Sequence, residues 1–275
     1  MNSSSNVRLE NGQPHQARKR FGQNFLIDQA VIDRIIDQIA PQQDEHLLEI
    51  GPGQGALTHA LARTAGHLDC VELDRDLVRH LNKQFGSLGS VVITQGDILK
   101  FDIASLTDQA NSLRIIGNLP YNISTPVLFH LLQSHGLIRD MTFMLQLEVV
   151  QRMIAGPGDK NYGRLGLMLQ YYCQVEHLFN VPSAAFSPRP RVSSAIVKLT
   201  PHRQLPVPAQ DENVLERVIR SAFNQRRKTL KNSLKGIISE DQLAQLPVDA
   251  GLRPERLSLA DFVVLSDAAT DNETQ

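Results

Sequence analysis

The 275-residue sequence contains no tryptophan, only two cysteines and few aromatic residues. Cys70 and Cys173 lie far apart, each in an apolar segment, which argues against a secreted scaffold held together by disulfides. The sequence has no apolar run of membrane-spanning length and no histidine spacing typical of metal ligands. We therefore expect a cytoplasmic protein that binds neither a membrane nor a metal.

Acidic residues are absent from one long basic stretch, although the formal net charge is only −1. Segment 217–235 has seven basic residues and no acid, whereas the chain from Glu240 onward has eight acids and two arginines. A solvated helix face is the alternative, but such faces normally mix both signs. The segment is typical of a surface that binds nucleic acid. The candidate contacts are Arg217, Arg220, Arg227, Lys228, Lys231 and Lys235.

A glycine-rich turn, Gly51–Gly55, follows a predicted strand at 47–50 and precedes a predicted helix from Ala56. Strand, glycine turn and helix are the nucleotide-binding arrangement of open α/β sheets, and glycine lets the backbone approach a ligand closely. The spacing differs from the dinucleotide fingerprint, and the turn lacks a phosphate-binding lysine. The turn therefore suits a nucleoside that carries an amino-acid tail; the alternative is a tight connection without a ligand.

Acids lie at the ends of the next two predicted strands, Glu72 in 67–72 and Asp97 in 91–98. A carboxylate at the position of Glu72 can accept hydrogen bonds from both hydroxyls of a ribose. Asp97 can accept a hydrogen bond from the exocyclic amine of an adenine. Each acid taken alone is equally compatible with a solvated strand end or a helix cap. Because open α/β sheets bind ligands at the carboxyl ends of their strands, we expect both acids to converge with the glycine turn.

The tetrapeptide Asn118–Tyr121 ends a fourth predicted strand, at 113–116. The side-chain carbonyl of Asn118 and the backbone carbonyl of Leu119 can each accept a hydrogen bond from an exocyclic amine of a nucleobase. The nitrogen lone pair is then freed for attack. Pro120 shapes the backbone without adding a donor, and stacking of a base on Tyr121 is worth about 1–3 kcal/mol. A turn that merely closes the strand is the alternative.

Six segments carry a resemblance to a known family: Lys19–Leu26, Glu49–Gly53, Glu72–Asp74, Asn118–Ser124, Phe186–Pro190 and Phe223–Lys228. With them the chain resembles the ribosomal RNA adenine dimethyltransferase family, and within it the bacterial small-subunit members. The resemblance implies S-adenosyl-L-methionine as cofactor, with contacts at Asn24, Leu26, Gly51, Glu72, Asp97 and Asn118. It also implies catalytic positions at Asn118, Leu119, Pro120 and Tyr121, with Phe186 stacking on the base from the other side. Gln54-Gly55 makes the turn more flexible than the family pattern.

The activity implied by the resemblance is dimethylation of two adjacent adenosines near the 3′ end of small-subunit (16S) rRNA. We expect a monomer that acts on the assembling 30S particle and takes part in its biogenesis. A large-subunit rRNA methyltransferase of the antibiotic-resistance type is disfavoured by the long basic C-terminal segment. A DNA adenine methyltransferase is disfavoured because no sequence-reading domain is evident. A non-catalytic, RNA-binding assembly factor is disfavoured by the intact Asn118 and acids.

The expected fold class is α/β, a Rossmann-like S-adenosylmethionine-dependent methyltransferase sheet with a small all-helical C-terminal domain. We expect a disordered tail at 1–17, the methyltransferase domain at 18–200, a proline-rich linker at 201–210 and a helical RNA-docking domain at 211–275. Residues 28–40 predict an amphipathic helix. Residues 171–181 and 192–199 predict late strands.

Overall fold

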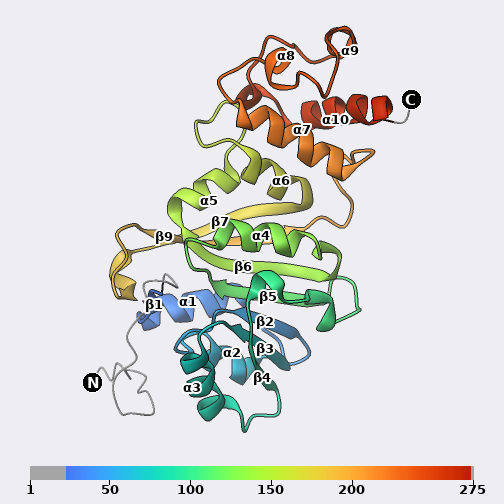
Figure 1. Cartoon of the computed structure of the whole chain (residues 1–275). Helices are drawn as coiled ribbons and strands as arrows, with labels where there is room; N and C mark the ends of the chain where they lie inside the picture. The colour runs from blue at the N-terminus through green and yellow to red at the C-terminus, as the bar shows by residue number, and fades with distance from the viewer. Residues whose placement is uncertain (1–22, 274–275) are drawn as a thin grey trace. The chain divides into compact units, whose positions relative to one another are not determined.

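The computed structural model describes residues 23–273, so the expected tail and the basic residues Arg18–Arg20 lie outside the described residues (Figure 1). By its contacts the chain divides into two compact units. The first comprises residues up to 150 together with 176–201, and the second comprises 151–175 together with the chain from 202. The chain thus passes between the units three times, the last time at the start of the expected linker. The segment 151–175 groups with the C-terminal helices.

The first unit is built on a seven-stranded sheet with the order β4-β3-β2-β5-β6-β9-β7. Its strands are β2 (His46–Ile50), β3 (His67–Glu72), β4 (Val91–Gln95), β5 (Leu113–Asn118), β6 (Ile138–Gln146), β7 (Cys173–Val181) and β9 (Ser194–Pro201). The pairs among β2 to β6 are parallel, and β9 runs antiparallel to β6. The chain winds outward from β2 through β3 to β4 and then from β5 to β6. The winding direction therefore changes between β2 and β5, as in doubly wound folds.

The register of the parallel strands aligns their carboxyl ends at one edge of the sheet. Ile50 pairs with Val71 on one side and with Gly117 on the other. Gly117 is required here because a Cβ at this position would lie 2.8 Å from the Ile50 carbonyl oxygen. The glycine turn after β2 and Asn118 at the end of β5 are therefore neighbours, although they are far apart in sequence.

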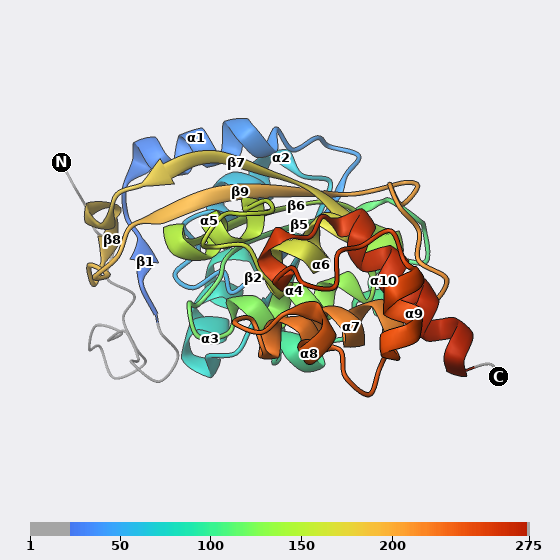
Figure 2. The same cartoon turned by 90° about the horizontal axis from the view of Figure 1, so that it is seen from above.

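Helices cover the sheet on both sides, and Figure 2 shows α1 (Gln29–Ile39) and α4 (Ser124–Leu132) on opposite faces. Helix α1 begins after Asp28, whose side chain accepts hydrogen bonds from the backbone amides of Ala30 and Val31. It ends at Ala40, which adopts the left-handed conformation. Its buried Ile32, Ile35 and Ile39 join Leu47 of β2 in the main core. The remaining helices of this unit are α2 (Thr58–Thr64) and α3 (Arg75–Phe85).

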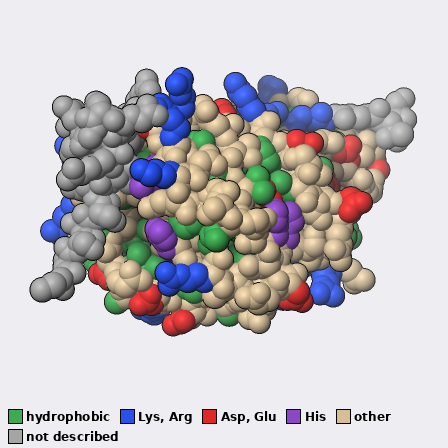
Figure 3. All heavy atoms as spheres, turned by 90° about the horizontal axis from the view of Figure 1, so that it is seen from below, with side chains coloured by type: hydrophobic (Ala, Val, Ile, Leu, Met, Phe, Trp, Pro, Cys, Tyr) green, Lys and Arg blue, Asp and Glu red, His purple; other side chains and the backbone are tan. Residues whose placement is uncertain are grey.

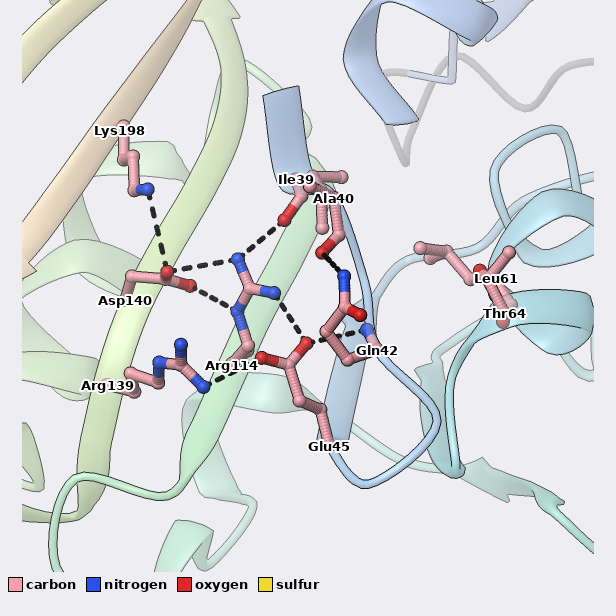
Figure 4. A network of polar contacts seen from close by, with 10 residues as sticks. All are labelled: Ile39, Ala40, Gln42, Glu45, Leu61, Thr64, Arg114, Arg139, Asp140 and Lys198. Atoms are coloured by element: carbon pink, nitrogen blue, oxygen red, sulfur yellow. Dashed lines mark hydrogen bonds and ion pairs between the residues drawn. The ribbon is translucent and has the colours of Figure 1, made fainter. Parts of the chain in front are cut away.

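A buried ionic network ties the amino ends of the strands together (Figure 4). The Arg114 guanidinium on β5 donates to both carboxylate oxygens of Asp140 at 3.0 Å, to Glu45 at 2.7 Å and to the Ile39 carbonyl at 2.7 Å. Burial acts to raise the pKa of Glu45, but hydrogen bonds from Arg114 and from the Gln42 amide bring that pKa below its ordinary value. Because every charge in the network is paired, it holds α1, β5 and β6 together at the amino ends of the strands. The glycine turn, Glu72, Asp97 and Asn118 lie at the opposite, carboxyl ends.

The short elements of the first unit include β1 (Phe25–Leu26), which pairs antiparallel with β8 (Phe186–Ser187). This pairing brings the N-terminal Gln-Asn-Phe-Leu segment against a loop from the other end of the unit. The 3₁₀ turns are η2 (Ile98–Lys100), η3 (Ile103–Ser105), η4 (His135–Leu137) and η5 (Ser183–Ala185).

The second unit is mainly helical. Helix α5 (Leu147–Ile154) enters it, and α6 (Arg164–Tyr172), α7 (Glu212–Asn224), α8 (Leu230–Ser233), α9 (Glu240–Gln245), η6 (Pro254–Arg256) and α10 (Leu259–Glu273) follow. Helices α7 and α10 pack together, with the Phe223 and Phe262 rings 5.8 Å apart. The basic segment 217–235 is therefore interrupted: α7 ends at Asn224, and α8 starts at Leu230. In the described part of the chain, no helix has the length and apolar character needed to cross a membrane.

Candidate active site

A cavity of ≈ 360 Å³ opens at the carboxyl edge of β2 to β5. This volume is in the range of pockets that hold small organic ligands. Nine of the ten residues predicted for catalysis or cofactor binding line it: Asn24, Leu26, Gly51, Glu72, Asp97, Asn118, Leu119, Pro120 and Tyr121. The convergence expected from the alternation of strands and helices is thus present in the structure. Phe186 is the tenth, and it lies elsewhere.

The glycine turn clears space for a ligand. Gly51, Gly53 and Gly55 all have positive φ values, between 61° and 86°, which other residues adopt only with strain. A Cβ on Gly51 would meet no atom within 4 Å, so this position faces open space. A Cβ on Gly53 would lie 3.2 Å from the Phe25 ring. Glycine at 53 therefore allows the β1 segment to close one side of the cavity.

Glu72 is held in place by backbone amides of two different loops. Its Oε2 accepts from the Gly53 amide at 3.1 Å and its Oε1 accepts from the Asp74 amide at 2.8 Å. Burial raises the pKa of Glu72 above its ordinary value. Each carboxylate oxygen keeps a further acceptor site, so the group can accept the two hydroxyls of a ribose from a fixed position.

Asp97 both caps a helical turn and lines the cavity. Its Oδ1 accepts from the Leu99 amide at 3.1 Å and caps the turn η2. The residue also lines the cavity beside Ile98. The cap aims the carboxylate, whose remaining acceptor sites can bind an amine in the cavity.

Asn118 is oriented by the N-terminal segment. Its Nδ2 donates to the backbone carbonyl of Asn24 at 3.1 Å, so the side-chain oxygen is left as the acceptor. The next residue, Leu119, is fully buried, and its amide donates to the Met144 carbonyl on β6 at 3.3 Å. These contacts give the end of β5 a fixed geometry, and Asn118 lines the cavity.

Tyr121 and Phe186 differ in what the structure shows. The Tyr121 hydroxyl shares a hydrogen bond of 2.9 Å with the Ser194 hydroxyl on β9, and burial raises the tyrosine pKa. The half-buried ring lines the cavity and is available for stacking. Phe186 is only 4% exposed, packs in the main core and does not line the cavity. Its stacking role therefore stays a prediction.

Glu49 is a site residue that the sequence reasoning did not assign, although it belongs to the glycine motif. It lines the cavity, is 2% exposed, and accepts from the Thr58 hydroxyl at 2.7 Å. Burial, with a smaller contribution from the negative charge of Glu72, raises its pKa to about 7. An acid inside the apolar strand 47–50 was the available signal, because a carboxyl buried there must be protonated, paired or close to a positively charged ligand.

We expect the Glu49→Gln variant to have a weaker pH dependence of stability than the wild type. Because the folded-state pKa of Glu49 is about 7 and the ordinary value is 4.5, the folded protein binds the extra proton between these values. The free energy of unfolding therefore falls as the pH rises through this window, by at most about 3 kcal/mol. The variant should match wild type near pH 4.5 and be more stable at pH 8. Denaturant unfolding without cofactor measures this, and identical pH profiles would contradict it.

The candidate RNA-binding residues lie in the second unit. Arg220, Arg227, Lys228, Lys231 and Lys235 are exposed, whereas Arg217 is half-buried. Lys231 forms an ion pair with Glu240 at 2.7 Å, so its charge is partly neutralised by a residue outside the basic segment. On the face drawn in Figure 3, by comparison, basic and acidic side chains both occur among polar and apolar ones. Nucleic-acid binding by these residues remains a prediction.

A doubly wound sheet with a glycine turn after its first strand and an acid after its second is the nucleoside-binding arrangement that S-adenosylmethionine-dependent methyltransferases share with other open α/β folds. The chain belongs to the ribosomal RNA adenine dimethylase family, whose model matches residues 14–270. The cofactor of this enzyme is therefore S-adenosyl-L-methionine, and the cavity fits it. Glu72 would hold the ribose and Asp97 the adenine amine, while Gly51 leaves room for the ligand.

Curated relatives cover nearly the whole chain. It is 58% identical to a "Ribosomal RNA small subunit methyltransferase A" of Pseudomonas syringae pv. tomato over 257 residues, which are 94% of this chain and 96% of that protein. It is 55% identical to the protein of the same name from Pseudomonas aeruginosa, covering 92% and 94% of the two chains. The one from Hahella chejuensis is 54% identical, covering 94% of each.

Solved structures agree with the fold. A dimethyladenosine transferase from Plasmodium falciparum superposes with a TM-score of 0.73 at 25% identity, covering 88% of this chain and 95% of that one. The 23S rRNA methyltransferase ErmE superposes with a TM-score of 0.69 at 23% identity, covering 90% and 100%. The second likeness supports the fold alone.

Proposed function

We propose that the protein transfers methyl groups from S-adenosyl-L-methionine to the exocyclic amines of two adjacent adenosines near the 3′ end of 16S rRNA, giving dimethyladenosines. The observation that carries this is the orientation of Asn118, whose amide donates to the Asn24 carbonyl and leaves its oxygen as an acceptor at the cavity. The names of the curated relatives support small-subunit RNA as the substrate. The protein would act as a cytoplasmic monomer on the assembling 30S particle and contribute to its biogenesis.

The residues of the site perform the reaction mainly by positioning. Asn118 Oδ1 and the Leu119 carbonyl accept the two N–H groups of the adenine amine, which frees the nitrogen lone pair. When bound, the cofactor supplies a methyl group on a positively charged sulfur. The amine loses its proton only after attack, so no strong general base is needed. Most of the rate acceleration comes from holding the amine and the methyl group in the correct geometry.

Tyr121 offsets the cost of presenting the base. Taking an adenosine out of an RNA stack costs a few kcal/mol, and stacking on an aromatic ring returns about 1–3 kcal/mol. The hydrogen bond to Ser194 holds the tyrosine ring in one place. The ring can therefore receive the base without first losing much freedom of its own.

The alternatives from the sequence are less well supported. The Plasmodium structural relative is named as a dimethyladenosine transferase, and the curated relatives are named for the small subunit, not the large one. A purely non-catalytic assembly factor would not need Asn118 held with its acceptor at a cofactor-sized cavity. A second, binding-only role in assembly is compatible with the same surface.

Mapping of methylated adenosines by mass spectrometry tests the proposal. RNA from cells with and without the protein is compared, with a strain that carries the Asn118→Ala variant as a matched control for protein level. We expect two adjacent dimethyladenosines of 16S rRNA to disappear in the strain without the protein and in the variant strain. Loss of a methyladenosine from large-subunit RNA instead, or no change in either RNA, would reject it.

We expect charge reversal in the second unit to reduce the salt dependence of RNA binding. Arg220 and Lys228 are exposed, whereas Lys231 is paired with Glu240, so the variant of choice is Arg220→Glu with Lys228→Glu. Each phosphate contact contributes a slope of about −0.7 to −0.9 in log affinity against log salt. A salt titration with small subunits should show weaker binding and a slope that is flatter by about two contacts.

The control for this variant is Arg63→Glu with Lys83→Glu, which makes the same charge change on exposed positions of the first unit. It should keep the wild-type slope. Identical slopes for all three proteins would show that the basic segment is an ordinary solvated surface.

A further inference from the structure

Two histidines and an aspartate form a compact cluster at the amino ends of β2 and β3. The Asp69 Oδ2 lies 2.6 Å from His46 Nε2 and 3.2 Å from His67 Nε2. The two imidazole rings are 4.7 Å apart and nearly perpendicular, at 82°. All three potential ligand atoms lie within 4.8 Å of one another.

The register of the sheet places these side chains together. His46 and His67 are direct partners on neighbouring parallel strands, so they project from the same face. Asp69 follows His67 by two residues and projects from that face as well. Cys70 projects from the opposite face, where its thiol contacts Glu49. The cluster therefore rests on two central strands, and its geometry does not depend on a loop.

We propose that His46, His67 and Asp69 bind a divalent transition-metal ion, with zinc the best match and water completing the coordination. Two imidazole nitrogens and one carboxylate oxygen are a common zinc donor set, whereas calcium and magnesium prefer oxygen ligands. Zinc bonds of about 2.0–2.1 Å in a tetrahedral site place neighbouring ligand atoms roughly 3.3 Å apart. The His67 to Asp69 distance already matches this value, and the His46 to Asp69 distance has to lengthen by less than 1 Å.

The cluster is open enough to receive an ion. The side chains of His67, His46 and Asp69 are 41%, 23% and 10% exposed. Solvent therefore reaches the imidazoles, while the carboxylate is anchored in the sheet. Such a site would join β2 to β3 through a bound ion and stabilise the folded chain by mass action.

The cluster and the cofactor cavity lie at opposite ends of the same strands. His46 begins β2 and Gly51 follows its end, a distance of roughly 15 Å along the strand. An ion bound by the cluster therefore touches neither the cofactor nor the reacting amine. Zinc should change the stability of the protein and leave its cofactor affinity unchanged.

Calorimetric titration of the full, chelator-treated protein with zinc chloride tests the proposal. We expect one zinc ion per chain with a micromolar Kd and a higher melting temperature in zinc. His67→Ala and the near-isosteric Asp69→Asn should each weaken zinc binding at least about tenfold, since loss of even a supporting residue costs 10- to 100-fold. The control His177→Ala, an exposed histidine on β7 that bonds to Asn180, should bind zinc like wild type.

Cofactor titration of the same variants separates metal binding from folding. Unchanged affinity for S-adenosylmethionine in His67→Ala and Asp69→Asn, together with the loss of zinc binding, supports the site. The proposal is rejected if wild type binds no zinc, or if both variants bind it as tightly as His177→Ala does. In the second case the ligands lie elsewhere in the chain.

Discussion

Replacement of Asn118 by alanine is expected to lower the rate of methyl transfer by about 100- to 1000-fold, the loss seen when a polar group that stabilises a transition state is removed. The structure gives the reason. Asn118 is the side-chain acceptor at the cavity end of β5, and its orientation is set by the Asn24 carbonyl. Alanine cannot accept an amine proton, so the nitrogen lone pair would stay delocalised in the adenine ring.

Binding of the RNA should be nearly unaffected by this change, because affinity comes mainly from phosphate contacts. Single-turnover transfer of labelled methyl groups to unmodified small subunits measures the rate, and a filter assay on the same particles measures affinity. Asn82→Ala, an exposed position on α3, is the matched control and should behave as wild type. Near-normal turnover of Asn118→Ala would remove Asn118 from the mechanism.

Replacement of Glu72 by alanine is expected to weaken binding of S-adenosylmethionine by about 5- to 160-fold, equivalent to roughly 1–3 kcal/mol for the loss of charged hydrogen-bond partners. Part of this loss comes from the ribose contacts. The rest comes from the Gly53 and Asp74 amides, which Glu72 holds in place. Glu72→Gln keeps the size and one acceptor oxygen, so it should lose less.

Replacement of Asp97 tests the predicted contact with the adenine of the cofactor, with Asp102 as the matched control. Asp97→Ala removes the cap of η2 together with a cavity acceptor, whereas Asp102→Ala removes the equivalent cap of η3 at an exposed position outside the cavity. Calorimetric titration should show weaker cofactor binding for Asp97→Ala and wild-type binding for Asp102→Ala. Unchanged affinity in both Glu72→Ala and Asp97→Ala would overturn the assignment of the cofactor site.

Much of the first unit could be predicted because local patterns and tertiary packing agree there. Apolar spacing predicted a helix at 28–40, and α1 occupies 29–39 with Asp28 as its N-cap. The alternation of strands and helices predicted that Gly51, Glu72, Asp97 and Asn118 would meet at one edge. Parallel strands with crossover helices leave their carboxyl ends on the same side, so sequence order alone places these residues together.

The secondary-structure prediction was wrong where a helix is buried on most sides and therefore has no amphipathic pattern in the sequence. Helix α6 at 164–172 was not expected, and its last two residues were assigned to a strand. The helix is buried on nearly all sides, so it lacks the polar face that identifies a helix in a sequence. Gly166 is needed there because a Cβ would lie 2.5 Å from the Arg152 carbonyl oxygen. That contact joins segments separated by a loop and leaves no local signal.

The sequence by itself determined the class of fold and the edge of the sheet at which the predicted site residues meet, because these depend on residue type, strand order and short spacings. Only the tertiary structure decided which carboxyls are buried, that Phe186 packs in the core, and that Lys231 is paired with Glu240. It also brought His46, His67 and Asp69 together. Each of these follows from the register of strands or the packing of helices, which joins residues that no local pattern in the sequence connects.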